Sequence, residues 1–176
     1  NWSAPASDVD NWPRLVQLGW YCCDASGQVL RSQQYLIKPQ GFKISPQAAQ
    51  LHGITTQLAL RDGVDLFPVL EEFSAEVRAA KVVVAHNLDF DQKVMQAEFV
   101  RAKLADVFAR KKRICTMKET ADYCRLPGKY GYKWPSLTEL HRHLFGTPFE
   151  GAHGALADAE ACQRCFFRLR ELGVFT

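Results

Sequence analysis

A short run of β-branched residues between two helical patterns constrains the fold of this chain more than any other feature. Lys81-Val82-Val83-Val84 has the composition of a buried strand, and residues 64–80 and 92–102 on either side have the apolar spacing of helices. The pattern continues with a strand expected at 114–117, a helix at 118–125 and a last helix at about 155–172. Strands separated by helices predict an α/β domain.

The first part of the chain is expected to form an antiparallel hairpin. Residues 15–23 and 28–39 are strand-like, and Asp24-Ala25-Ser26-Gly27 between them suits a tight turn. A hairpin followed by alternating helices and strands indicates a mixed sheet with helices on both faces. Cap residues predict two further helices, at 46–52 after Ser45 and at 137–145 after Ser136.

The composition fits one folded domain covering residues 1–176. With 47% hydrophobic and 23% charged residues, the chain is large enough to bury a full core. No apolar run approaches the length of a membrane span, and the first residues do not form a signal peptide. The six cysteines lack the spacing of a disulfide framework or a zinc site. We therefore expect a cytoplasmic protein with free thiols and no membrane partner.

Two segments carry the residue types of a divalent-metal site. Asp91 ends the segment Ala85-His86-Asn87-Leu88-Asp89-Phe90-Asp91, where the expected strand leads into a helix. His153 and Asp158 stand five positions apart at the start of the last helix, so they share a face only if His153 lies in the preceding loop. Hard divalent ions need several oxygen ligands, and hydrolysis needs a nearby base.

Each of these residues, taken alone, has a simpler explanation. An Asp before a helix is often an N-cap, which applies to Asp91. Asp158 is equally compatible with a solvated helix position, and His153 with a loop or core histidine. The functional interpretation therefore depends on the joint pattern.

The order of these residues resembles the second and third motifs of the DEDDh (DnaQ-like) 3′–5′ exonucleases, the family of the proofreading subunit of bacterial DNA polymerase III. The motifs are His-Asn-x-x-Phe-Asp at 86–91 and His-x-x-x-x-Asp at 153–158. The supporting segments are Pro13–Gly19, Leu51–Thr55, Cys115–Met117 and Ser136–Leu140. The resemblance implies a ribonuclease H-like fold and a metal-dependent exonuclease that releases nucleoside monophosphates.

The resemblance also implies roles for individual residues. Asp91 and Asp158 would hold two divalent ions, Mg or Mn, and His153 would take a proton from the attacking water. The substrate would be the 3′ end of single-stranded DNA or RNA, and a polymerase is a possible partner.

Three more residues are expected to contact the substrate on the basis of the resemblance. His52 would contact the terminal nucleotide, and Asn87 and Phe90 would lie near the scissile end. Alternatives remain open, because His52 also suits a helix C-cap and Phe90 also suits a core position.

The family's first motif is Asp-x-Glu at the end of the first central strand, and no Asp-x-Glu precedes the Pro13–Gly19 segment. Asp8-Val9-Asp10 is the nearest approach, but no apolar strand precedes it and we expect a loop. Loss of a central strand would leave unpaired backbone groups at about 1–3 kcal/mol each. We therefore expect about 10–20 additional N-terminal residues in the biological protein. An intact mass equal to that of 176 residues would contradict this.

Two other classes of protein remain open. Without an upstream Asp-x-Glu, the chain would be a catalytically inactive nucleic-acid-binding or scaffold module. It would be a metal-independent protein if Asp91 and Asp158 only cap helices.

The net charge of +3 permits binding to a polyanion. One basic cluster, Arg110-Lys111-Lys112-Arg113, suits either a solvated loop or contacts with phosphates. A second group combines cations with aromatic rings. It suits either stacking on nucleic-acid bases or an ordinary surface loop. Its members are Lys129, Tyr130, Tyr132, Lys133 and Trp134.

Overall fold

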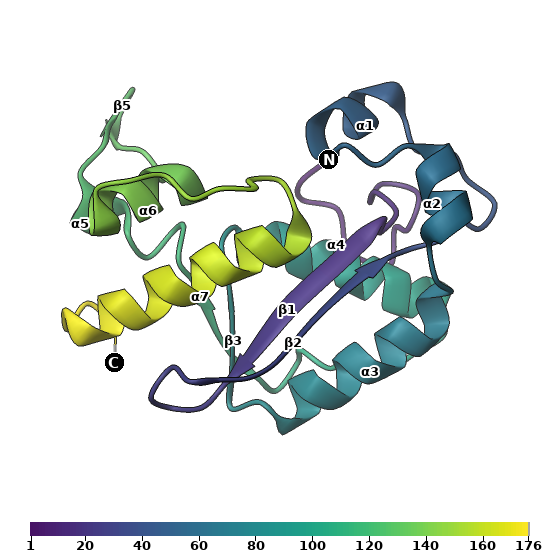
Figure 1. Cartoon of the computed structure of the whole chain (residues 1–176), viewed down its shortest axis with the longest axis horizontal. Helices are drawn as coiled ribbons and strands as arrows, with labels where there is room; N and C mark the ends of the chain where they lie inside the picture. Colours follow the sequence, from purple (N-terminus) through teal and green to yellow (C-terminus); the bar gives the residue numbers. More distant parts are fainter. Residues whose placement is uncertain (176) are drawn as a thin grey trace.

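The computed structural model describes residues 1–175 (Figure 1). The first half of the chain contains β1 (Gln17–Cys23), β2 (Val29–Leu36), α1 (Pro46–His52), α2 (Thr56–Asp62), α3 (Leu66–Ala79), β3 (Val82–Ala85) and α4 (Leu88–Arg101). The second half contains β4 (Lys112–Cys115), α5 (Ala121–Cys124), β5 (Pro127–Gly128), β6 (Gly131–Tyr132), α6 (Leu137–Phe145) and α7 (Ala155–Glu171).

Within residues 1–175 the strands pair two by two. β1 and β2 form the expected antiparallel hairpin, with Gln17 opposite Leu36. β3 and β4 are parallel, with Val82 opposite Lys112, and β5 and β6 form a small antiparallel hairpin. The expected single mixed sheet is therefore present as separate ladders. Helix α7 packs on both β1 and β3 and so connects the two larger ladders (Figure 1).

The core consists of layers of helices against these strands. The main cluster lies between the β1–β2 hairpin and helices α3 and α4, and includes Trp20, Leu70 and Phe99. A second cluster joins β4, α6 and α7 through Ile114, Leu140 and Leu169, among others. The apolar faces of the three long helices are thus buried against strands or other helices, as amphipathic helices require.

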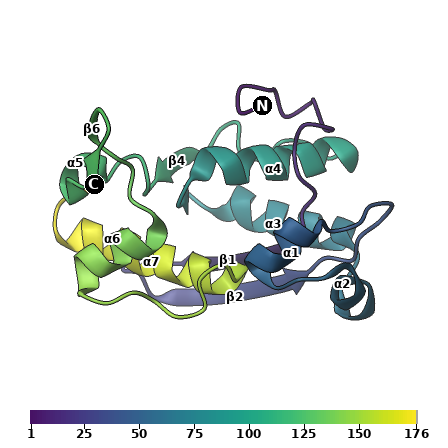
Figure 2. The ribbon, with the colours of Figure 1, turned by 90° about the horizontal axis from the view of Figure 1, so that it is seen from above.

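The N-terminal segment lies over α4 without forming a strand (Figure 2). Trp12 and Ala4 are buried against Ala97 of α4, and the indole of Trp12 donates to the carbonyl of Pro5 at 3.0 Å. Residues 8–10 lie in a loop, as expected. The segment is therefore packed onto the same helix that carries Asp91.

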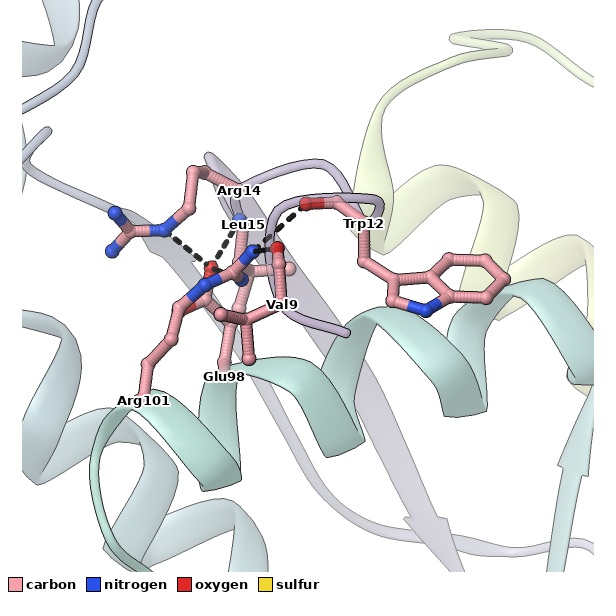
Figure 3. A network of polar contacts seen from close by, with 6 residues as sticks. All are labelled: Val9, Trp12, Arg14, Leu15, Glu98 and Arg101. Carbon is pink, nitrogen blue, oxygen red and sulfur yellow. Dashed lines mark hydrogen bonds and ion pairs between the residues drawn. The ribbon is translucent and has the colours of Figure 1, made fainter. Parts of the chain in front are cut away.

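A buried carboxylate fixes the end of this segment (Figure 3). Glu98 of α4 is completely buried, and its Oε1 accepts hydrogen bonds from the Arg14 side chain and the Leu15 backbone N–H, both at 2.9 Å. Arg101 pairs with the same oxygen at 2.9 Å. The second Arg101 nitrogen donates to the backbone carbonyls of Val9 and Trp12. This network ties α4 to the chain that enters β1.

Helices with strong local caps begin and end as predicted. The Ser45 hydroxyl accepts from the N–H of Ala48, and Gly53 ends α1 in the left-handed conformation. Ser136 and Glu139 form both bonds of a capping box at the start of α6.

Three other expectations were inaccurate. Helix α2 was not predicted, although Thr55 caps it through the N–H of Leu58. Helix α4 begins at Leu88, so Asn87 and not Asp91 occupies the N-cap position. The helix expected at 118–125 is reduced to Ala121–Cys124, because turns occupy the residues before it.

Candidate active site

Asp91 and Asp158 occupy the same position in two different helices. Each is the fourth residue and lies in the first turn, Asp91 in α4 and Asp158 in α7. The N-terminus of a helix carries partial positive charge, which favours a nearby carboxylate. Two segments that are distant in sequence thus present acidic groups from the same kind of structural position.

The β1–β2 hairpin sets the position of the Asp158 helix. The N–H of Ala155 donates to Oε1 of Gln17 at 2.9 Å, and the N–H of Leu156 donates to Oε1 of Gln34 at 3.2 Å. Gly19 permits this close approach, because a Cβ at that position would lie 2.7 Å from the nitrogen of Leu156. Side chains of the two strands therefore cap α7 from outside the helix.

The electrostatics of the two carboxyl groups are coupled. Desolvation by the surrounding protein and the charge of Asp158 raise the pKa of Asp91 to about 7, although the residue as a whole is exposed to solvent. Desolvation also raises the pKa of Asp158, and His153 opposes this increase. Within residues 1–175 neither carboxylate forms an ion pair with a cationic side chain. Two neighbouring carboxylates with no such partner are suited to a bound cation.

The donor chemistry fits a hard divalent ion, but the ligand set is partial. Carboxylate oxygens are the ligands that Mg²⁺ and Mn²⁺ prefer. No group of three or more His, Cys, Asp or Glu side chains converges on one point in the described part of the chain. If such an ion binds here, Asp91 and Asp158 would be two of its ligands and further ligands would be needed.

His153 lies next to Asp158, in the loop before α7 as expected. Its backbone N–H donates to Oδ1 of Asp158 at 3.2 Å, and its φ of 74° is in the left-handed region. The flanking Gly151 and Gly154 form a turn through a 3.0 Å backbone bond. His153 is exposed, so its imidazole has access to water beside the carboxylate.

The three expected substrate contacts occupy different settings. His52 ends α1, and its Nδ1 accepts the N–H of Ile54 at 3.1 Å, as a C-cap histidine does. Burial lowers the pKa of His52, so the neutral ring carries its proton on Nε2 and can donate there. Asn87 has a φ of 71°, and its side chain makes no capping bond. Phe90 packs partly on the Ala4–Trp12–Ala97 cluster, with the Trp2 ring 5.5 Å away between centroids.

A family model for exonucleases (RNase_T) matches residues 8–166, which include all six candidate residues. The chain belongs to the exonuclease family. This confirms the resemblance to the DEDDh (DnaQ-like) 3′–5′ exonucleases. No curated protein sequence matches the chain at a significant level.

Solved structures of E. coli exonuclease I are similar in fold to this exonuclease domain. The complex with a dT13 oligonucleotide has a TM-score of 0.77 at 19% identity, and the match covers 98% of this chain and 40% of the exonuclease I chain. The complex with a dA16 oligonucleotide has a TM-score of 0.73 at 20% identity, and the match covers 90% of this chain and 37% of that protein. The zinc-bound complex with single-stranded DNA has a TM-score of 0.74 at 21% identity, and the match covers 97% of this chain and 38% of that protein. The fold is thus ribonuclease H-like, and the chain spans about two-fifths of these proteins.

His86 of the exonuclease domain joins two other segments through hydrogen bonds that the sequence did not reveal. Its Nε2 lies 3.0 Å from the carbonyl of Pro135, and its Nδ1 lies 3.0 Å from Oγ1 of Thr116. A carbonyl only accepts, so Nε2 carries the proton, and burial lowers the pKa of His86 in favour of this neutral form. The only feature of the sequence that pointed to His86 was its place in the second motif, at residues 86–91.

The basic cluster at 110–113 is partly committed to the fold. Lys111 donates to the backbone carbonyls of Arg78 and Ala80 at the end of α3, at 2.7 and 2.8 Å. Arg113 donates to Gln92 of α4 at 2.9 Å. The cluster thus serves first to join α3 and α4 to the start of β4.

None of the helices in residues 1–175 is long and apolar enough to span a membrane.

Proposed function

We propose that this domain belongs to a metal-dependent 3′–5′ exonuclease that hydrolyses phosphodiester bonds at single-stranded 3′ ends and releases nucleoside monophosphates. One observation carries the proposal: Asp91 and Asp158, from two distant helices, are electrostatically coupled, and the backbone of His153 is bonded to Asp158. Membership of the exonuclease family supports it.

In this proposal the two aspartates hold divalent cations, Mg or Mn. Such ions, when bound, neutralise charge on the attacking and leaving oxygens of the phosphodiester. His153 accepts the proton of the attacking water, the role of a general base that imidazole side chains most often fill in enzymes. Asp158 holds the backbone of His153 in place, so one side chain serves the cation and the base. The family's first-motif Asp-x-Glu pair, which is not found before Pro13 in these residues, would supply the remaining carboxylates.

Single-stranded DNA is the proposed substrate. The E. coli exonuclease I structures contain dA16 and dT13 oligonucleotides, and their fold covers nearly all of this chain. His52, Asn87 and Phe90 are the proposed contacts to the terminal nucleotide. RNA remains an alternative substrate, because no residue is diagnostic for a 2′-hydroxyl. Association with a polymerase is part of the proposal only through the family resemblance.

The test is a Mn²⁺-dependent assay on a single-stranded oligonucleotide, with the protein at its natural length. His153→Ala is expected to lower kcat by about 10²- to 10⁴-fold, the usual contribution of a general base. Asp158→Asn is expected to lower it at least as much, and the exposed Asp122→Asn serves as the matched control. Retention of the wild-type rate by either active-site variant would refute the assignment.

An inactive nucleic-acid-binding module is the second candidate, and it applies if no Asp-x-Glu precedes Pro13 in the protein at its natural length. It predicts single-strand binding with no release of mononucleotides at any Mn²⁺ concentration. The same assay distinguishes the two candidates.

A further inference from the structure

Three large rings are exposed together on and beside the β5–β6 hairpin. Tyr130 is 90% exposed, Tyr132 53% and Trp134 56%. The hairpin projects from the body of the domain next to α5 (Figures 1 and 2). Water contact with so much aromatic surface is unfavourable, and gathered exposed apolar groups mark interaction sites.

Lysines accompany these rings. Nζ of Lys129 lies 5.0 Å from the centroid of the Tyr130 ring, and Nζ of Lys118 lies 5.3 Å from that of Trp134. Lys118 also pairs with Asp89 at 2.5 Å, and Lys133 pairs with Glu139 at 2.6 Å. The carboxylates offset part of the positive charge. A ligand of this surface would therefore be recognised mainly through stacking on the rings, with Lys118 and Lys129 beside them.

Two contacts attach this surface to the helix that carries Asp91. The partner of Lys118 is Asp89, two residues before Asp91 in the first turn of α4. Pro135, directly after Trp134, accepts a hydrogen bond from His86, directly before the N-cap of the same helix. The rings are thus held in a fixed relation to the start of α4.

We propose that Tyr130, Tyr132 and Trp134, with Lys118 and Lys129, form a stacking surface for the single strand on the 5′ side of the nucleotide being removed. The proposal rests on the proposed function, which places the 3′ end at Asp91. Rings interleaved with cations are the usual means of binding single strands without sequence preference. Because this combination lies beside the proposed site for a 3′ end, we favour nucleic acid over a protein partner.

The test compares one long and two short substrates, using Tyr130→Ala and Trp134→Ala in the protein at its natural length. Binding of dT20 and dT3 is measured by fluorescence anisotropy in Ca²⁺, and hydrolysis in Mn²⁺ is measured on dT20 and on the p-nitrophenyl ester of thymidine 5′-monophosphate. Phe67→Ala is the matched control, since Phe67 is 48% exposed and its helix α3 lies away from the β5–β6 hairpin (Figure 1).

Each alanine variant is expected to weaken dT20 binding by about 5- to 100-fold more than dT3 binding, the range found for loss of one base–aromatic stack. The Mn²⁺ rate on dT20 is expected to fall more than that on the ester. Tyr130→Phe and Trp134→Phe are expected to restore most of the affinity, because they restore a ring.

Unchanged dT20 binding in both alanine variants would overturn the proposal, and would leave a protein partner as the remaining explanation for the rings. Equal losses on dT20, dT3 and the ester would also overturn it, because they would indicate a structural role. Selective loss of dT20 binding in a protein that hydrolyses nothing would support this surface and refute the proposed function instead.

Discussion

At the scale of single residues, Asp91 links the proposed chemistry to stability. In the metal-free protein, desolvation and the charge of Asp158 raise its pKa to about 7, whereas in the unfolded chain it titrates near 3.8. Between these values the folded state binds more protons than the unfolded state. The contribution of Asp91 to stability therefore falls as the pH rises from about 4 to about 7.

The substitution Asp91→Asn removes the titrating carboxyl group. The Asp91→Asn protein should therefore become more stable relative to wild type as the pH rises from about 4 to about 7. Thermal unfolding in EDTA at several pH values between 4.5 and 7.5 measures the difference in Tm. Parallel Tm curves for the two proteins would show that Asp91 is not desolvated as described. Asp122→Asn, on the surface of α5, is the control and should follow wild type.

Glu98 is the other residue whose substitution should have a large effect. It is fully buried and accepts from Arg14, Leu15 and Arg101, so Glu98→Ala leaves two partly buried guanidinium groups and a backbone N–H without their partner. We expect a loss of about 3 kcal/mol in the free energy of unfolding, as for other broken buried ion pairs. Urea denaturation measures it. The control is Glu171→Ala, which breaks the exposed pair with Arg168 and should lower the free energy of unfolding by less than about 1 kcal/mol.

At the scale of elements, the contact between β1 and α7 decides where Asp158 lies. Gly19→Ala would place a methyl group 2.7 Å from the nitrogen of Leu156, so the strand and the helix must separate. Overpacking of this kind is expected to cost about 1–3 kcal/mol and to lower the nuclease rate. Ser32→Thr, which adds a methyl group at an exposed position of β2, is the control. A Gly19→Ala protein with wild-type stability and rate would show that this contact does not position the site.

Elements with local signals were predictable, and those set by distant contacts were not. Ser45, Ser136 and Gly53 fix helix ends through neighbours a few positions away, which a sequence pattern records. Helix α2 has a cap at Thr55 but only seven residues, too few for a clear apolar period.

The start of α4 was placed too late because the left-handed conformation of Asn87, a non-glycine residue, has no strong sequence signal. The residues before α5 form turns instead of helix, so the helix predicted at 118–125 was too long.

The candidate site was predictable only in part, for the same reason. The placement of His153 in a loop before Asp158 followed from helical geometry and two glycines, and the structure confirms it. The capping of α7 by Gln17 joins residues far apart in the chain, and no periodic pattern encodes it. Glu98 looks like an ordinary polar helix residue until the Arg14 segment is seen to cover it.

At the scale of the whole molecule, two ladders of strands are held together by helices that carry the acidic residues. α7 packs on both β1 and β3, and α4 packs on β3 and β4. The acidic first turns of these two helices therefore depend on how the ladders are spaced. We expect Mn²⁺ binding and global folding to be linked, since an ion held by both helices stabilises only the folded state.

The most direct measurement of the central claim is a Mn²⁺ titration, followed by electron paramagnetic resonance, of the protein at its natural length and of Asp91→Asn, Asp158→Asn and Asp122→Asn. Our account predicts that wild type and Asp122→Asn bind Mn²⁺ with the same affinity, while each of the other two variants loses at least tenfold. Equal Mn²⁺ affinity in all four proteins would contradict it, because Asp91 and Asp158 would then not share a metal site.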